Sequence, residues 1–390
     1  MTPDTLARLR ADTPACATLI HFNNAGAALQ PLAVTRAMDD WLAAERRMGG
    51  YEAEAALSPV LDGFYTSMAR LIGASPDEIA FAESATRAWD SALHAIPWQA
   101  GDEVIVHVTD YGSCTLTLRM LAARRGVVVR VCPSDETGQI DTRALAAMIG
   151  PRTRLVALTH VPTNGGLVNP AEAVGQVTRA AGVLFLLDAC QSLGQVPLDV
   201  AAIGCDMLSA TGRKYLRGPR GTGVLYVARS ALDRLEPAFI DGHSAAPQGD
   251  GWRWEEGARR FEQFERNFAG MAGMAAAADY AMDIGMDQIA TRLADLAASL
   301  RDRLAAIPGV TVRDRGARRG GIVTFTHDRV AAPDMLAPLR AQGINTSVAT
   351  AHWAPRDFAE RGLPPMLRAS VHAYNTADEI DRFAAAIAAF

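Results

Sequence analysis

The chain contains a single lysine, Lys214, among 38 basic residues, and all the others are arginine. A general preference for arginine over lysine explains the many arginines but does not explain why one lysine is kept. Arginine keeps its proton at ordinary pH, whereas a lysine side chain can become a neutral amine and form a Schiff base with an aldehyde. Lys214 is therefore the first candidate catalytic residue, at a position where only an amine would serve.

Polar residues follow five of the predicted strands, each at the point where the strand ends. The strands are apolar on both faces, which is typical of a parallel sheet covered by helices. Ligands of such sheets bind beyond the carboxyl ends of the strands, so we expect the polar segments to meet there. They are residues 83–87, 110–113, 162–166, 188–191 and 209–214.

Each of these segments has an ordinary explanation beside the functional one. Residues 85–86 open a helix and could cradle a phosphate, or belong to an ordinary serine-capped helix start. Tyr111 could lie on a planar ring or simply pack, and Asn164 could bind a ligand or belong to a turn. Asp188 follows a very apolar run, where a carboxylate is costly unless it is paired. It could hold a positive charge or cap a turn.

Taken together, the segments match the needs of pyridoxal 5′-phosphate. That cofactor needs an amine for its aldehyde and an acid at its pyridine nitrogen, which Lys214 and Asp188 supply. Tyr111 offers an aromatic ring to stack on the cofactor, and Thr211 and Arg213 offer partners for the phosphate. Five signals in this order at successive strand ends favour the cofactor site over five unrelated turns.

The elements that must position these residues indicate an α/β protein of two domains. Helical and strand patterns alternate from about Ser58, which predicts a mostly parallel sheet covered on both faces. After about Arg259 an alanine-rich helical stretch with a break at Gly285 leads into a smaller α+β region. We expect an N-terminal segment, 1–20, packing on the small domain, a large cofactor-binding domain, 21–258, and a small C-terminal domain, 259–390.

Composition limits the function classes further. A net charge of −5 and a pI near 5.9 give no general attraction to nucleic acid. We expect no signal peptide at the N-terminus, which has early acidic residues and no long apolar run, and the longest apolar stretch is too short to span a membrane. The five cysteines show no CxxC pair and no His–Cys metal spacing. We expect free thiols, no metal site and a cytoplasmic protein.

Three stretches of the sequence resemble the class V aminotransferase family of fold-type I pyridoxal-phosphate enzymes. They read DACQSLGQVPLDV, LSATGRKYLRGPRGTGVLYV and LRASVHAYNTADEID. The family includes cysteine desulfurases, cystine C–S lyases, kynureninase and isopenicillin N epimerase. The resemblance covers nearly the whole chain. It implies a large domain with a mostly parallel seven-stranded sheet between helices, a smaller C-terminal α+β domain, and a homodimer with sites completed across the interface.

The resemblance also implies a role for each candidate residue. Lys214 would form the Schiff base, Asp188 would meet the pyridine nitrogen, and Tyr111 would stack on the ring where desulfurases place a histidine. Three further groups are implied. Gln191, Thr163 and Asn164 would bond the ring's phenolic oxygen; Ala85, Thr86, Thr211 and Arg213 would hold the phosphate; Arg368 and Asn24 would bind the substrate, the arginine at its carboxylate. Asn267 would lie near the segment that crosses to the partner subunit.

One departure from the family pattern affects the expected reaction. Desulfurases carry a nucleophilic cysteine on a loop before the carboxylate-binding arginine, but the corresponding stretch, INTSVATAHWAPRDFAERGLPPMLR, contains none. Persulfide transfer to a scaffold protein is therefore not expected. Cys190, between Asp188 and Gln191, and Cys114 are expected to be packed thiols that do not replace it.

We expect an enzyme that acts on an amino acid through an external aldimine, with Lys214 removing the α-proton. The favoured reaction is β-elimination from a cysteine S-conjugate or its sulfoxide, giving pyruvate and ammonia. Transamination or epimerisation is the alternative, with Tyr111 and His352 as candidate proton donors. A silent cofactor-binding protein is the alternative of another class. Trp252, Trp254 and Trp353 are candidate pocket walls, and the identity of the amino acid stays open.

Overall fold

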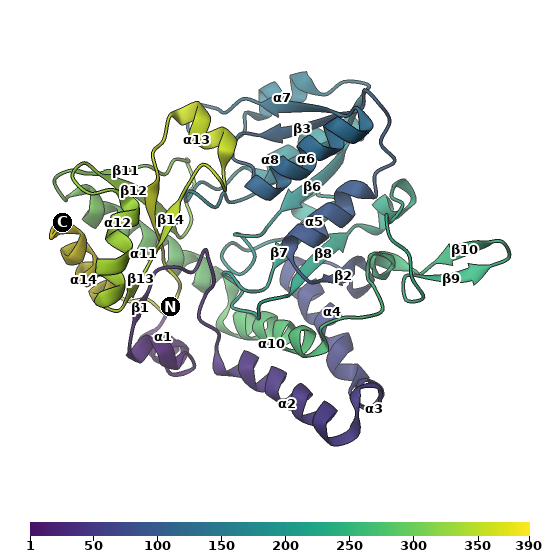
Figure 1. Ribbon diagram of the computed structural model, residues 1–390, viewed down its shortest axis with the longest axis horizontal. Coiled ribbons are helices and arrows are strands. Elements are labelled where there is room, and N and C mark those ends of the chain that lie inside the picture. Colours follow the sequence, from purple (N-terminus) through teal and green to yellow (C-terminus); the bar gives the residue numbers. More distant parts are fainter.

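The computed structural model describes all residues 1–390 and is built around a seven-stranded sheet (Figure 1). The strand order is β2-β8-β7-β6-β5-β3-β4, in which β8 runs antiparallel to both of its neighbours and the other pairs are parallel. The predicted mostly parallel sheet is therefore confirmed. The strands are β2 Ile79–Ala82, β3 Glu103–His107, β4 Val128–Cys132, β5 Thr153–Thr159, β6 Leu184–Asp188, β7 Met207–Thr211 and β8 Gly223–Val227.

Two separate apolar layers cover the two faces of this sheet, because successive strand side chains point to opposite faces. Leu184 and Leu186 of β6 pack in one layer with helices α5 and α6, whereas Phe185 and Leu187 pack in the other with α4 and α8. The helices before residue 210 are α1 Pro3–Ala11, α2 Leu32–Met48, α3 Gly50–Ala56, α4 Ser58–Ile72, α5 Ala85–His94, α6 Gly112–Arg125, α7 Thr142–Met148, α8 Ala171–Ala181 and α9 Val200–Ile203.

The C-terminal part contains a four-stranded antiparallel sheet of order β11-β12-β15-β14. Its strands are β11 Val310–Val312, β12 Ile322–His327, β14 Ser347–Ala349 and β15 Met366–Ser370, and a short parallel pair joins β1 Ile20–His21 to β13 Ile344–Asn345. The remaining helices are α10 Phe268–Ile284, α11 Met286–Ala305, α12 Ala332–Ala341, α13 Pro355–Arg361 and α14 Ala377–Ala388. None of the helices is long and apolar enough to cross a membrane.

The alanine-rich stretch is divided at Gly285, as predicted. Gly285 has a φ of 94°, a conformation that costs glycine little and other residues much, so α10 ends before it and α11 begins after it. Helix α10 packs against α2 and α4, and α11 packs against α14. Arg10 of α1 contacts Glu379 of α14 at 2.7 Å. The domain division at 20/21 and 258/259 stays a prediction.

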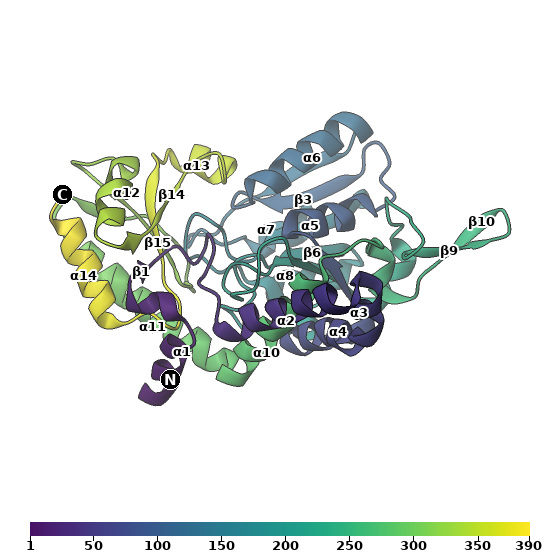
Figure 2. The ribbon, with the colours of Figure 1, turned by 60° about the horizontal axis from the view of Figure 1, so that its bottom comes forward.

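A hairpin of β9 Ala245–Gln248 and β10 Gly251–Trp254 extends away from the rest of the molecule. Figure 1 and Figure 2 both show it at the edge of the large sheet, far from the C-terminal part. Trp252 on this hairpin is 52% exposed. The predicted pocket-wall role of Trp252 and Trp254 therefore finds no support within a single chain.

Candidate active site

Four predicted cofactor residues line one narrow cavity on the α5–α6 face of the large sheet. Ala85 and Thr86 come from the start of α5, Tyr111 from the residue before α6, and Asp188 from the end of β6. Cys190 and Ser209 also line this cavity. Residues from three distant parts of the sequence thus meet beyond the carboxyl ends of β3 and β6, as the spacing of polar residues predicts.

Strand register explains why Asp188 points to this face. Asp188 pairs with Thr159 of β5 and with Ser209 of β7, so the three side chains stand side by side on one face of the sheet. Leu187, one residue earlier, packs in the opposite apolar layer. Asp188 is buried, and its Oδ1 accepts a hydrogen bond of 2.9 Å from the Cys190 amide.

The electrostatics of Asp188 suit a carboxylate that awaits a positive partner. Burial raises the pKa of the Asp188 carboxyl, while the Cys190 amide, the Lys214 charge and the Thr159 hydroxyl all act to lower it. A buried carboxylate with few donors is stabilised by any positive charge placed against it. A protonated pyridine nitrogen would supply that charge.

The amine of Lys214 reaches the same place from the turn after β7. Lys214 is buried, and its Nζ lies 3.4 Å from Cys190 Sγ and 5.8 Å from the centre of the Tyr111 ring. The turn is fixed by Arg217, the only non-glycine residue with a positive φ, whose amide bonds to the Lys214 carbonyl at 2.9 Å. The predicted Lys214, Asp188 and Tyr111 are therefore neighbours in space.

The predicted phosphate residues lie at the start of α5 and at the end of β7. Ser84 caps α5 by accepting the Arg87 amide at 3.2 Å, which is the ordinary role weighed for this segment. The amides of Ala85 and Thr86 lie in the first turn, where backbone donors have no partner inside the helix. Thr211 bonds to the Thr222 carbonyl at 3.1 Å and Arg213 to the Gly26 carbonyl. Phosphate binding by these four residues stays a prediction.

Tyr111 stacks on an aromatic residue of the loop before α13. Its ring is nearly parallel to that of Trp353, with the ring centres 5.6 Å apart and an angle of 5°. The Gly112 amide bonds to the Trp353 carbonyl at 2.9 Å, and Arg356 pairs with the buried Asp110 at 3.1 Å. The loop that replaces the desulfurase cysteine loop is thus fastened to the site. His352 is exposed and meets Trp353 edge-on.

The residues predicted to bond the phenolic oxygen are only partly gathered. Gln191 donates to the Ala25 carbonyl at 3.0 Å and to Thr163 Oγ1 at 3.3 Å, and its Oε1 is buried without a partner. Asn164 instead turns its amide to Asp357 of α13. Thr163 and Gln191 therefore lie together, whereas Asn164 faces the loop.

Arg368 lies on β15 and is oriented by groups from three other segments. Its Nη1 bonds to Thr163 Oγ1 at 2.8 Å, its Nε to Ser347 Oγ at 3.0 Å, and its Nη2 to Asn23 Oδ1 at 3.4 Å. Burial lowers the pKa of the Arg368 guanidinium to about 10, so it stays positive at neutral pH. A fixed guanidinium of this kind can bind a carboxylate in a bidentate manner.

The other predicted binding residue, Asn24, is occupied by the fold. Its Nδ2 donates to the His21 and Ser370 carbonyls at 3.0 and 2.7 Å, and its Oδ1 accepts the Tyr374 hydroxyl. Asn23, one residue earlier, is the one that meets Arg368. Asn267 caps α10 through the Gly270 amide at 2.8 Å. Substrate contact by Asn24 and partner contact by Asn267 stay predictions.

Sequence reasoning missed two neighbours of the site. Cys190 was expected to be a packed thiol, but it is only partly buried and is the nearest polar contact of Lys214 Nζ. Asp110 was noted only as a polar residue at a strand end, yet it anchors Arg356. The signal for Cys190 was its position two residues after Asp188. The Asp110–Arg356 pair spans 246 residues and left no local signal.

The donor set fits pyridoxal phosphate. Asp188 is a buried carboxyl in need of a positive charge, Lys214 is an adjacent amine, and Gln191 Oε1 and Ser209 Oγ are buried without partners. Buried polar atoms without partners are rare in folded proteins and indicate a missing group. Ser209 lines the same cavity as Asp188 and Tyr111, so a polar ring bound there would lie near its hydroxyl group.

Comparison with known proteins agrees with this assignment. The family model for aminotransferase class-V matches residues 20–383. A cysteine desulfurase of Yersinia pestis (strain Pestoides F) is 31% identical, with 98% of this chain and 97% of that relative covered. The apo structure of a cysteine desulfurase from Thermococcus onnurineus NA1 is similar with a TM-score of 0.92 at 25% identity, covering 100% of this chain and 98% of that one.

A lyase is also among the similar structures. The cystine C–S lyase C-DES, in complex with its reaction product cysteine persulfide, has a TM-score of 0.87 at 25% identity, covering 97% of this chain and 99% of that chain. A mutant of C-DES holds glycine covalently linked to its PLP cofactor. The residues gathered at the strand ends and these matches give one conclusion: the chain belongs to the class V aminotransferase family of fold-type I pyridoxal-phosphate-dependent enzymes.

Proposed function

We propose that this protein is a C–S lyase that eliminates the sulfur substituent of a cysteine S-conjugate or its sulfoxide and releases pyruvate and ammonia. The carrying observation is the segment 346–366, which reaches the candidate site through Trp353 and Arg356 and contains no cysteine. A desulfurase that passes on persulfide needs a thiol on this segment. Its absence, together with the likeness to a cystine C–S lyase, favours elimination.

Three side chains carry the chemistry in this proposal. Pyridoxal phosphate, when bound, supplies an electron-accepting ring that stabilises negative charge at the substrate α-carbon. The Asp188 carboxylate would keep the ring nitrogen positive, and the Lys214 amine would take the α-proton as a general base. The Arg368 guanidinium would hold the substrate carboxylate, oriented by Thr163 and Ser347. The electrons of the C–S bond leave with the sulfur, so no external oxidant or reductant is needed.

The loop before α13 has a positioning role in this scheme. The Trp353 ring stacks on one face of the Tyr111 ring. The opposite face of Tyr111 would then be free to stack on the cofactor ring. The Asp110–Arg356 pair ties the loop to the end of β3. A fixed aromatic cover limits the access of water to the reacting carbon.

We also propose that the protein acts in the cytoplasm as a homodimer. Its five cysteines are all free, which suits a reducing compartment. The exposed apolar side chains of Phe239, Ile240, Trp252 and Phe264 lie on or near the projecting hairpin. Surfaces of this kind mark protein contacts, and a second copy is the partner implied by the family.

The experiment that tests the lyase proposal measures two signals at once. Purified yellow protein is mixed with cysteine, cystine and cysteine S-conjugate sulfoxides while pyruvate and the visible spectrum are followed. Sustained pyruvate release with the starting spectrum restored is the expected result. Bleaching without pyruvate would identify a transaminase, and loss of substrate chirality without either signal would identify an epimerase.

The control is Lys214→Arg, which keeps the positive charge but removes the amine. We expect this variant to lose turnover by at least about 10⁴-fold, because both the cofactor link and the general base are removed. Retained turnover would overturn the assignment of Lys214. A protein that stays colourless after pyridoxal phosphate is added would overturn the cofactor assignment as well.

A further inference from the structure

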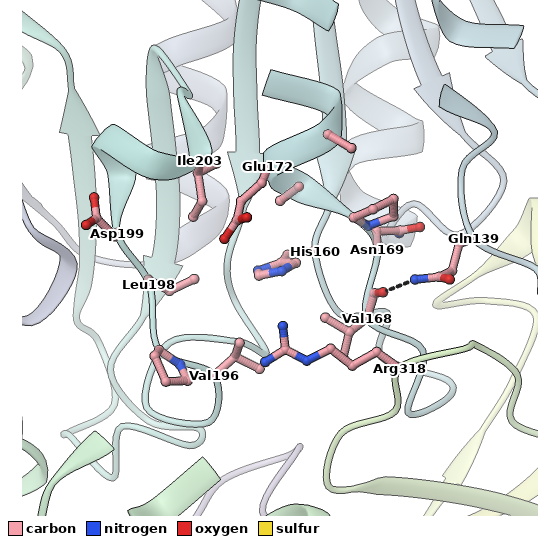
Figure 3. Close-up of a pocket in the computed structure, with 14 residues that line it drawn as sticks. Gln139, His160, Val168, Asn169, Glu172, Val196, Leu198, Asp199, Ile203 and Arg318 are labelled. Carbon is pink, nitrogen blue, oxygen red and sulfur yellow. Dashed lines mark hydrogen bonds between the residues drawn. The ribbon is translucent and has the colours of Figure 1, made fainter. Parts of the chain in front are cut away.

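A second cavity lies on the other face of the large sheet. It has a volume of about 520 Å³, within the roughly 300–1,000 Å³ range of small-molecule sites. Thr159, the last residue of β5, shares the face of Asp188, so the next residue, His160, points to the α8 side. Figure 3 shows the His160 ring near the middle of this cavity. The lining residues include none of the predicted cofactor or substrate residues.

His160 is a buried side chain with no partner. Its exposed fraction is 5%, its Nδ1 is buried without a hydrogen bond, and no protein group bonds to either ring nitrogen. Burial, together with the smaller effect of the nearby Arg318 charge, lowers the pKa of the His160 imidazole to about 4. At neutral pH the ring is therefore uncharged and offers one donor and one acceptor. A buried ring of this kind normally has a partner in the protein, in ordered water or in a bound ligand, and the protein supplies none here.

Two charges of opposite sign flank this ring. In Figure 3 Glu172 of α8 lies on one side of His160, and Arg318 from the loop before β12 lies on the other. Neither side chain makes an ion pair, and neither makes a side-chain hydrogen bond, whereas Asp199, the other acid at the cavity, already caps α9 through the Ala201 and Ala202 amides. The cavity thus presents one unused positive charge and one unused negative charge.

The rest of the lining is largely apolar. Val168, Val196, Leu198 and Ile203 line the cavity and can contact an aliphatic side chain. A simple anion would be attracted by Arg318 but repelled by Glu172. A simple cation would be attracted by Glu172 but repelled by Arg318. A molecule that carries both charges beside an apolar group satisfies all three features.

We propose that this cavity is a second binding site, for a zwitterionic α-amino acid with an aliphatic side chain. Arg318 and the His160 ring bind its carboxylate, Glu172 binds its ammonium group, and Val168, Val196 and Ile203 contact its side chain. This site stands apart from Lys214 and does not depend on the reaction proposed above. It adjoins the catalytic centre through the backbone, because the His160 amide donates to the Asp188 carbonyl at 2.9 Å.

The test is calorimetric titration of the cofactor-loaded protein with L-leucine. We expect binding to persist within about twofold in Arg368→Ala, which lacks the guanidinium proposed to hold a substrate carboxylate at the catalytic centre. Arg318→Ala and Glu172→Gln should each weaken binding by at least about fivefold, the value of a single partly exposed charge contact. Both side chains are exposed, so neither change should disturb folding. The matched control, Arg319→Ala, removes an exposed arginine that does not line the cavity and should leave binding unchanged.

Two fragments of leucine separate a zwitterion site from a simpler one. 4-Methylpentanoate keeps the carboxylate and 3-methylbutylamine keeps the ammonium group, and each should bind at least about fivefold more weakly than leucine. Equal binding of 4-methylpentanoate would overturn the proposal in favour of a plain anion site. Leucine binding that disappears in Arg368→Ala but survives Arg318→Ala would also overturn it, since the ligand would then occupy only the catalytic centre. The absence of any heat of binding would do the same.

Discussion

Asp188 is a single residue that combines an electrostatic cost with a clear chemical use. It is buried at the end of an apolar strand, where burial raises the pKa of its carboxyl, and its side chain accepts one backbone amide at 2.9 Å. Such a group is costly as an isolated charge. The cost is offset only if a positive group lies against it, and Lys214 alone, which bonds to Cys190, does not provide that contact.

Replacing Asp188 by asparagine removes the negative charge of the side chain but keeps its shape. We expect Asp188→Asn to bind pyridoxal phosphate but to turn over about 10²- to 10³-fold more slowly, since the asparagine cannot hold a proton on the ring nitrogen. The measurement is steady-state pyruvate release together with the visible spectrum of the bound cofactor.

The matched control is Asp206→Asn. Asp206 is also a carboxyl whose pKa is raised by burial, and it accepts the Phe185 amide at 2.8 Å, at the opposite end of β6. This variant should lose some stability but keep its turnover per folded molecule. Equal losses of turnover in the two variants would show that Asp188 acts only through the stability of the strand.

At the scale of elements, the sequence carried the information on strands and their polar ends, but not the information on long-range pairing. The pattern of apolar residues predicted β6 and the break at Gly285. The expectation that polar residues at the carboxyl ends of strands meet in space predicted that Lys214, Asp188 and Tyr111 are neighbours. The contact of the Asn164 amide with Asp357 left no local signal, because Asp357 lies 193 residues away on α13. The predicted contact of Asn164 with the cofactor ring stays a prediction. The contacts of Trp353, in the loop before α13, and of Arg356, in the first turn of α13, likewise left no local signal, since they depend on tertiary packing against the segment after β3 and the start of α6.

Burial of Asp110, the partner of Arg356, makes the free energy of unfolding depend on pH. Burial raises the pKa of Asp110 to about 7, against 3.8 for an ordinary aspartate. The Arg356 charge acts to lower this pKa, and the Asp188 charge adds to the rise. The unfolded chain thus releases this proton at lower pH than the folded one. The stability that protonated Asp110 contributes is present below about pH 4 and is lost as the pH rises through about 7.

Asp110→Asn should therefore flatten the dependence of the unfolding free energy on pH between about pH 4 and 7, by an amount on the order of a few kcal/mol. Urea denaturation at several pH values measures it. Asp62→Asn alters a carboxylate that is 67% exposed and serves as the control, with the slope of the wild type. An unchanged slope in Asp110→Asn would mean that Arg356 keeps Asp110 ionised throughout this range.

For the whole molecule, the central sheet separates two binding environments by the alternation of strand residues. Thr159 at the end of β5 pairs with Asp188 of β6 on the α5–α6 face, so the next residue, His160, points to the α8 face. One sheet edge can therefore hold a cofactor on one side and a second ligand on the other. The hairpin β9–β10 contributes to neither cavity, although it exposes large apolar side chains.

That unused hairpin argues for a second copy of the chain. Ile240 and Trp252 are 51% and 52% exposed, and apolar groups at this exposure are stabilised by burial in an interface. We expect the wild type to sediment as a dimer and Ile240→Asp combined with Trp252→Asp to shift it towards the monomer by at least about tenfold in dissociation constant, since two buried charges each cost several kcal/mol. Leu116→Asp places the same charge on α6, where Leu116 is 62% exposed, and should leave the dimer intact. Dissociation by Leu116→Asp and not by the hairpin variant would place the interface on the α6 face instead.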